Sequence, residues 1–173
     1  MKPKLTLLSG SIFILSLAFA YADHPVPREL KKPGTQPELY NVEENHKEMR
    51  EAVHQARRSV RQFITALQRH SPDESDFEVK KPFVHDGHVE HIWLADVTFS
   101  GNRFHGLVDN HPHFIKGLKF GDRVSVNPGE ISDWAYLDHQ TLVGGYTIKA
   151  HYNGLSPERR KEMQHELNFK IGQ

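Results

Sequence analysis

HVEHIWLADVTF, residues 88–99, is the most hydrophobic of the segments whose composition is typical of a strand. Successive side chains of a strand point to opposite faces of its sheet. Ile92 and Leu94 are therefore expected on one face, and the other face is expected to hold Trp93, Ala95, Val97 and Phe99. Because both faces carry apolar residues, the segment is predicted to lie inside a sheet, with one face under a helix.

Strand patterns continue on both sides of this segment. Phe77–Phe83 also alternates, and Pro82, which has no N–H to donate, is typical of an edge strand. Asp86-Gly87 is a hairpin turn signal. Further strands are expected over residues 103–108, 123–126, 131–137 and 141–150, with residues 110–120 as a loop. Gly144-Gly145, inside the last of these strands, indicates a bulge or the close approach of another backbone.

Two segments have helical periodicity. Apolar residues recur three or four positions apart within Asn41–Gln68, at Met49, Val53, Ala56, Val60, Phe63 and Leu67. This stripe fits either a coiled-coil seam to a partner or packing on the chain's own sheet, and its shortness favours the second. Ser156 and Pro157 start a closing helix that extends to about Asn168.

Together these segments predict an α+β fold. A long N-terminal helix, residues 41–70, packs on an antiparallel sheet of about five or six strands, and a C-terminal helix follows. Residues 77–168 hold the sheet and the last helix, and they form one globular unit with the long helix.

The amino-terminal end has the pattern of an export signal. Lys2 and Lys4 precede an apolar run, and Ala20-Tyr21-Ala22 is a small-x-small cleavage site. The run is short for a membrane span, which needs roughly 20 apolar residues. We expect residues 1–22 to be a signal peptide cleaved after Ala22, leaving a periplasmic or secreted chain without a membrane span. Residues 23–40, with four prolines, are predicted to be a tether.

Composition excludes several classes of function. Without residues 1–22 the chain keeps 20 basic and 22 acidic residues, so it is no electrostatic match for nucleic acid. The chain has no Cys, which excludes a thiol enzyme, a disulfide scaffold and lipid attachment to cysteine. The sequence predicts no cofactor.

Histidines gather in two places. His85, His88 and His91 stand close together, and His111 and His113 follow in the predicted loop. Imidazole binds zinc, copper and nickel, but strand alternation separates His88 from His91. Ordinary surface and turn histidines are the favoured explanation, so no metal site is predicted. The weak candidates for metal ligands are His85, His88, His111 and His113.

A third group combines acids, an imidazole and two tryptophans. Glu90, His91 and Asp133 are the candidate catalytic residues, because an imidazole oriented by a carboxylate can act as a general base. No nucleophile completes this set, so the sequence favours a protein that is not an enzyme. One alternative is a core in which the ring N–H groups of both tryptophans find partners. The other is a ligand- or partner-binding surface made by Trp93, Trp134, Asn110 and His105.

Six short motifs occur in order along the chain: Glu90-His91-Ile92-Trp93, Phe104-His105-Gly106, Asn110, Gly121-Asp122-x-Val124, Ile131-x-Asp133-Trp134 and Gly144-Gly145-Tyr146-Thr147. Together they resemble the YegJ-like family, small bacterial proteins with a domain of unknown function. The resemblance covers roughly residues 77–150. It implies an α+β fold, agrees with export, and supplies no activity or catalytic residue.

The sequence therefore favours a non-catalytic binding or accessory domain with a protein partner. The expected partner is an envelope protein or a toxin. One alternative, by analogy with other small domains, is an immunity protein that neutralises a secreted toxin. The other alternative is a small hydrolase or metal-dependent enzyme that uses His91 and Asp133. The sequence does not predict the oligomeric state.

Overall fold

The computed structural model describes residues 47–172 of the chain. The predicted signal peptide with Ala22, the predicted tether and the start of the predicted long helix lie outside the described residues. The described elements, in order, are α3 (Lys47–Arg69), β1 (Glu74–His85), β2 (His88–Ser100), β3 (Arg103–Val108), β4 (Arg123–Val126), η2 (Pro128–Glu130), β5 (Asp133–Asp138), β6 (Thr141–Gly144), α4 (Tyr146–Gly154) and α5 (Pro157–Glu166).

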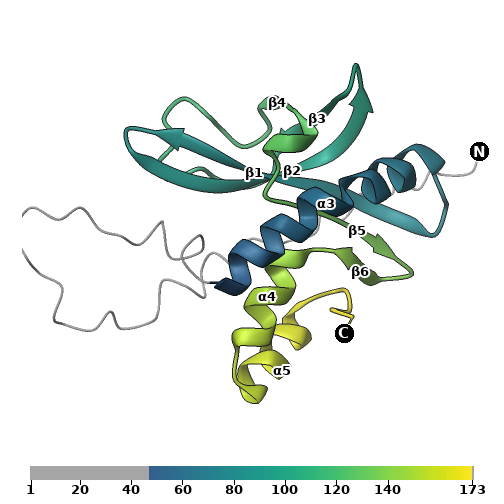
Figure 1. Ribbon diagram of the computed structural model, residues 1–173. Coiled ribbons are helices and arrows are strands. Elements are labelled where there is room, and N and C mark those ends of the chain that lie inside the picture. Colours follow the sequence, from purple (N-terminus) through teal and green to yellow (C-terminus); the bar gives the residue numbers. More distant parts are fainter. Residues whose placement is uncertain (1–46, 173) are drawn as a thin grey trace, which may run out of the picture.

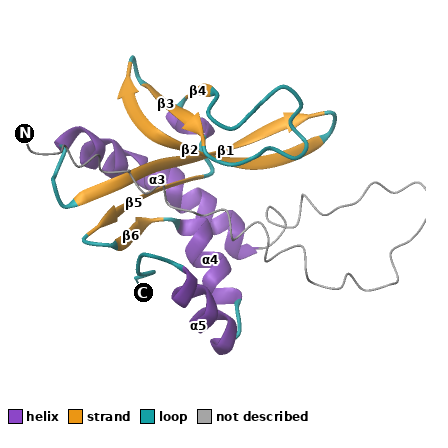
Figure 2. Ribbon diagram, turned by 180° about the vertical axis from the view of Figure 1, so that it is seen from behind, coloured by secondary structure: helices purple, strands orange, loops and turns teal. Residues whose placement is uncertain are grey.

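The strands form one antiparallel six-stranded sheet with the order β4-β3-β2-β1-β5-β6 (Figure 1). This confirms the α+β class and the antiparallel sheet. Strand β2 lies between β1 and β3, as its two apolar faces predict. Seen from behind, β1 and β2 lie in front of α3 (Figure 2). Within residues 47–172, no helix is long and apolar enough to cross a membrane.

The main core lies between α3 and one face of the sheet. Phe63 of α3 is fully buried, and its ring centroid lies 5.3 Å from that of Trp134 in β5 and 5.6 Å from that of Phe104 in β3. The same cluster includes Ala56 and Leu67 from the apolar stripe of the helix. The stripe of α3 therefore packs against strands of its own chain.

Two β-bulges change which residues share a face. Asp76 in β1 and Asp96 in β2 have φ angles of 52° and 50°, and the strand register shifts beside each of them. One extra residue inverts the alternation of a strand. Val97 and Phe99 consequently join Ile92 in the cluster under α3, whereas Trp93 lies in a second cluster. The predicted grouping of Trp93 with Val97 and Phe99 is wrong for this reason.

Strand β1 is an interior strand, so the prediction of an edge strand from Pro82 is wrong. Pairing with β5 ends at Lys80, although pairing with β2 continues to His85. The carbonyl oxygen of Lys80 accepts from the backbone N–H of Ser132 at 2.7 Å. Backbone groups two residues apart in a strand point toward the same neighbouring strand. The nitrogen of Pro82 therefore points to the β5 side, at a position beyond the part of β5 that pairs with β1. Its missing N–H therefore interrupts no ladder.

The predicted strand over residues 141–150 is also wrong, because it ends at Gly144 and α4 follows. Gly144 and Gly145 have φ angles of 70° and 58°, a region that L side chains rarely adopt. A Cβ on Gly144 would lie 2.4 Å from Cε3 of Trp134. The close approach inferred from the glycine pair is correct, but it makes a strand-to-helix turn and not a bulge.

The carboxyl-terminal segments cover part of the other face of the sheet. Their second core cluster contains Trp93, Ala135, Leu137, Leu142, Ile148 and Phe169. The hydroxyl of Ser156 accepts from the N–H of Arg159 at 3.3 Å, which confirms the predicted start of α5. The backbone N–H of Leu142 in β6 donates to the carbonyl oxygen of Lys170 at 2.8 Å, so the chain end lies along the edge of β6.

Candidate functional site

Asp133 begins strand β5 and is completely buried. Its Oδ1 accepts from the backbone N–H groups of Trp134 at 2.8 Å and Tyr146 at 3.1 Å. Its Oδ2 accepts from the N–H and the hydroxyl of Thr147, at 2.8 Å and 2.6 Å. These four bonds fill the acceptor capacity of a carboxylate. Two of the donors are N–H groups of the first turn of α4, which has no capping side chain of its own.

The surroundings of Asp133 shift the pKa of its carboxyl in opposite directions. Burial raises the pKa of this carboxyl above its usual value, while the hydrogen bonds from Thr147 and the positive charge of Lys80 lower it. Burial also lowers the pKa of the half-buried Lys149, against the effect of Asp133. A carboxylate with its lone pairs filled holds the β5–α4 junction, and it has none left to orient an imidazole.

The remaining residues of the predicted catalytic and binding groups lie apart. His91 contacts a different residue, since its Nδ1 lies 2.9 Å from Oγ of the buried Ser132. Trp134 is fully buried, and its Nε1 donates to the carbonyl oxygen of Ala56 at 2.9 Å. The side chain of Asn110 accepts from the backbone N–H of Trp93 at 3.2 Å. His105 is exposed on β3, where its Nε2 lies 3.4 Å from the carbonyl oxygen of Ser100.

Glu90 fastens the loop between β3 and β4 to strand β2. Its Oε1 and Oε2 accept from the N–H of His113 at 3.0 Å and 3.1 Å, and Oε2 accepts from the N–H of Phe114 at 3.0 Å. The N–H of Asp109 donates to the carbonyl oxygen of Trp93 at 3.0 Å and fixes the start of the loop. Glu90 therefore sets the position of the loop on β2.

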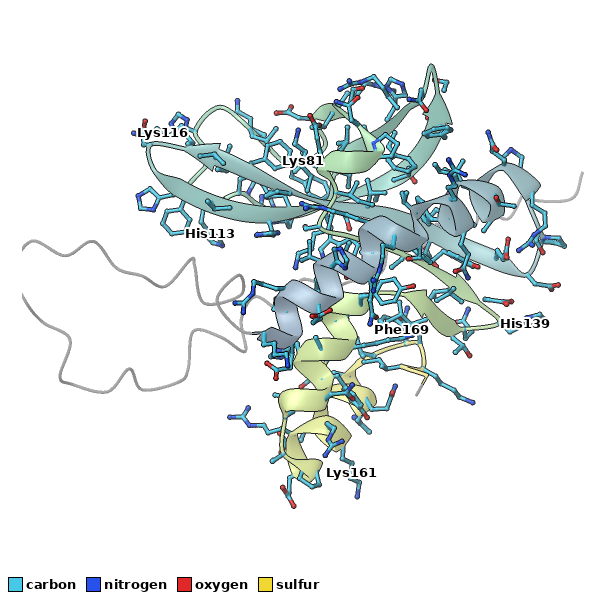
Figure 3. The ribbon with its side chains drawn as sticks, in the orientation of Figure 1. Lys81, His113, Lys116, His139, Lys161 and Phe169 are labelled. Atoms are coloured by element: carbon cyan, nitrogen blue, oxygen red, sulfur yellow. The ribbon has the colours of Figure 1, made fainter. Side chains whose placement is uncertain are left out.

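This loop and the β1–β2 hairpin bring the predicted metal ligands into one region. The ring of His88 lies 5.3 Å from that of Phe114, and His111 stacks on Phe120 at 5.4 Å. Lys116 lies 3.7 Å from Asp86 at the tip of the hairpin, and Figure 3 shows Lys116 and His113 at this end of the molecule. We call these residues the imidazole–aromatic surface: His85, His88, His111, His113, Phe114 and Phe120.

The imidazoles of this surface contact aromatic rings and carboxylates. His85 lies 3.3 Å from Asp86, and the ring of His113 lies 6.2 Å from that of Phe114. Within residues 47–172, no group of three or more His, Asp or Glu side chains is arranged to hold a metal ion. Phe120 is 56% exposed, an unusual position for a large apolar ring. The surface is thus suited to contact with another molecule.

Sequence reasoning missed the phenylalanines of this surface. Phe114 and Phe120 were given no role, although both lie in the predicted loop beside its histidines. Aromatic residues in a polar loop have no core to fill, and that mismatch was the available signal. Glu90 gave no such signal, because its backbone partners are 23 and 24 residues away in the chain.

A buried group of acids lies elsewhere in the sheet. Glu78 of β1 is 1% exposed, and burial raises its pKa well above the usual value, with a contribution from the charge of Asp109. Burial raises the pKa of Asp109 to about 6, and the charge of Asp96 adds to the effect. The negative charges of these carboxylates repel one another. The free energy of unfolding therefore depends on which of them are ionised, and so on pH.

The chain matches a known family of bacterial proteins. The family described as "Uncharacterized protein conserved in bacteria (DUF2314)" matches residues 46–171, which include every described strand and helix. The chain belongs to this family. The match confirms the resemblance seen in the motifs and extends it to α3, which the motifs did not cover.

Two proteins are similar to the chain. The chain is 35% identical over 123 residues to the uncharacterized protein YegJ of Escherichia coli strain K12, covering 71% of this chain and 76% of that protein. It is 31% identical over 132 residues to a protein of Neisseria meningitidis serogroup B named as an ankyrin repeat protein, covering 72% of this chain. The chain spans about half the length of that second relative, 52%. No solved structure matches the chain.

Proposed function

We propose that this DUF2314 chain is an exported, non-catalytic binding domain whose imidazole–aromatic surface contacts a partner protein. One observation carries the proposal: the half-exposed ring of Phe120 stacks on the imidazole of His111, on a loop that Glu90 holds in place. Aromatic residues that anchor interfaces are typically large rings on well-fixed elements. A preorganised loop also loses little entropy on binding.

The use of the acids supports binding over catalysis. Asp133 and Glu90 were the carboxylates available to a hydrolase, and both are occupied by backbone N–H groups. A general base needs a lone pair within reach of a substrate proton. Both carboxylates hold structural elements in place, one at a helix start and one at a loop. They therefore favour a protein that binds through its surface over an enzyme.

The charge of the surface defines the partner. Phe120 stacks on His111, and Lys116 and Lys119 are exposed on the same loop, so the partner we expect has an apolar pocket with an acidic rim.

The test is site-specific crosslinking in cells. A photoreactive benzoylphenylalanine replaces Phe120 in one strain and Glu162, exposed on α5, in a control strain. The proposal expects one protein crosslinked from position 120 only, and its binding to purified chain weakened by Phe120→Ser. Equal crosslinking from both positions, or unchanged binding by the Ser variant, contradicts it. The identity of the partner shows whether it is an envelope protein or a toxin.

Export is part of the same proposal. It rests on the predicted signal peptide, residues 1–22, and implies that the partner is met outside the cytoplasm. Mass spectrometry of the chain recovered from the periplasm or medium should give an amino terminus at Asp23. A full-length chain confined to the cytoplasm excludes an exported partner while leaving the binding surface open to the crosslinking test.

A further inference from the structure

A charged groove of about 470 Å³ lies where α3 meets β1 and β5. Helix α3 lines it from Arg61 to Arg69, and the strands line it with Glu74, Tyr136 and Asp138. Arg61, Thr65 and Arg69 are four residues apart, so they share one face of the helix. With a rise of 1.5 Å per residue, the helical wall between the two arginines is roughly 12 Å long.

Glu74 supplies a buried acceptor at one end of this groove. Its side chain is 3% exposed, and its Oε1 pairs with the guanidinium of Arg69, whose side chain is 56% exposed. Its Oε2 is buried and has no hydrogen-bond partner within residues 47–172. Buried carboxylate oxygens are almost always hydrogen-bonded in folded proteins. Glu74 lines the groove, and this unpaired oxygen is the acceptor that the residue can offer to a ligand.

Arg61 supplies a cation at the other end, two helical turns away. No ion pair joins Arg61 to another of residues 47–172, whereas Asp138 pairs with His139 at 2.7 Å. Figure 3 shows His139 on the side of the molecule where α3 ends, and Asp138 pairs with Glu74 across β1 and β5, so this acid lies at the Glu74 end of the groove. Two arginines and two acids line the groove, so its formal charge is zero with the signs separated along α3.

Tyr136 adds a neutral polar group to the lining. It is 5% exposed, and its ring stacks on Phe77 with centroids 4.9 Å apart, which fixes its position. Burial raises the pKa of Tyr136, and the charge of Glu74 adds to this, so the phenol remains a donor at neutral pH. Its hydroxyl hydrogen-bonds with Arg69, so the groove has a fixed hydroxyl and a buried anion at its Glu74 end and the cation of Arg61 at the other end.

We propose that this groove binds the zwitterionic form of a short peptide, with its ammonium group on Oε2 of Glu74 and its carboxylate on Arg61. An extended peptide spans about 3.3 Å per residue, so three residues match the spacing of roughly 12 Å. A ligand with one charge would leave the opposite end of the groove without a partner. This site is separate from the imidazole–aromatic surface and does not depend on the proposed function.

Isothermal titration of the purified chain with the tripeptide Ala-Ala-Ala tests the proposal. Saturable binding is expected, and either N-acetylation or C-amidation should weaken it about tenfold or more, since each removes one charge. Arg61→Gln and Glu74→Gln should have the same effect. Arg58→Gln and Glu51→Gln are the matched controls, because both residues are exposed on α3 and do not line the groove.

Three results overturn the proposal. They are no saturable heat up to about 10 mM peptide, equal binding of the capped peptides, or equal loss in the control variants. Amide chemical shifts of the unsubstituted chain provide a second readout if Glu74→Gln does not fold. Shifts confined to residues 61–74 and 136–138 support the groove, and shifts elsewhere refute it.

Discussion

Replacing Gly144 by Ala should destabilise the fold more than the same change at Gly106, Gly121 or Gly129, for two separable reasons. The first is backbone strain: φ is 70°, and an L side chain in this left-handed region costs about 1 to 2 kcal/mol. The second is space: the new Cβ would lie 2.4 Å from both Cε3 and the carbonyl oxygen of Trp134. Overpacking of this kind costs typically about 1 to 3 kcal/mol. The two costs together predict a loss of about 2 to 5 kcal/mol.

Three other glycines separate the two contributions. Gly121 has φ of 83° and nothing within 4 Å of a new Cβ, so Gly121→Ala tests strain alone at about 1 to 2 kcal/mol. Gly106 has no positive φ, but its Cβ would lie 2.9 Å from the carbonyl oxygen of Ala95, so it tests space alone at about 1 to 3 kcal/mol. Gly129 has neither problem, and its change should stay within about 0.5 kcal/mol.

Urea unfolding of all four variants, followed by far-UV circular dichroism, measures these differences. The slope with urea should stay constant, so that midpoints report stability alone. If Gly144→Ala costs no more than Gly121→Ala, the contact with Trp134 carries no energy and the account of the β6–α4 turn is refuted. If Gly129→Ala costs as much as the others, the effects belong to glycine in general.

Three further predictions concern buried polar groups and the chain terminus. Asp133→Asn should lower the free energy of unfolding, measured with urea, by about 2 to 4 kcal/mol. The reason is that an amide NH₂ replaces an oxygen that accepts from N–H or O–H donors. A loss under about 1 kcal/mol would show that α4 needs no such cap. Because the folded pKa of Asp109 is about 6, above its value of 3.8 in an unfolded chain, its protonated form is favoured by folding, and stability falls as pH rises from about 4 to 6. The loss is about 1 to 2 kcal/mol after allowance for the solvent around a half-buried group. Asp109→Asn should remove this pH dependence. If the free energies of unfolding of the variant and the unsubstituted chain differ by the same amount at every pH, the prediction is wrong. Trp134→Phe should cost about 1 to 3 kcal/mol, because the bond to the carbonyl oxygen of Ala56 is lost, and tryptophan fluorescence should then report Trp93 alone; an unchanged urea midpoint would show that this bond is dispensable.

The sequence by itself determined the elements whose signals are local. Strand alternation and the Asp86-Gly87 turn predicted the β1–β2 hairpin, and Ser156 with Pro157 predicted the start of α5. The class followed from the mixture of the two periodicities. These predictions hold because they depend on side-chain direction and on capping within a few residues of the chain.

The tertiary structure decided everything that depends on distant neighbours. Whether Pro82 lies at an edge depended on where β5 stops, and the faces of Trp93 and Val97 depended on a bulge at Asp96. Asp133 was nominated for catalysis because a carboxylate in sequence has no partners, yet α4 supplies donors 13 and 14 residues away. Hydrogen-bond capacity is used up by groups that only folding brings together, so a sequence can nominate polar residues without showing which remain available.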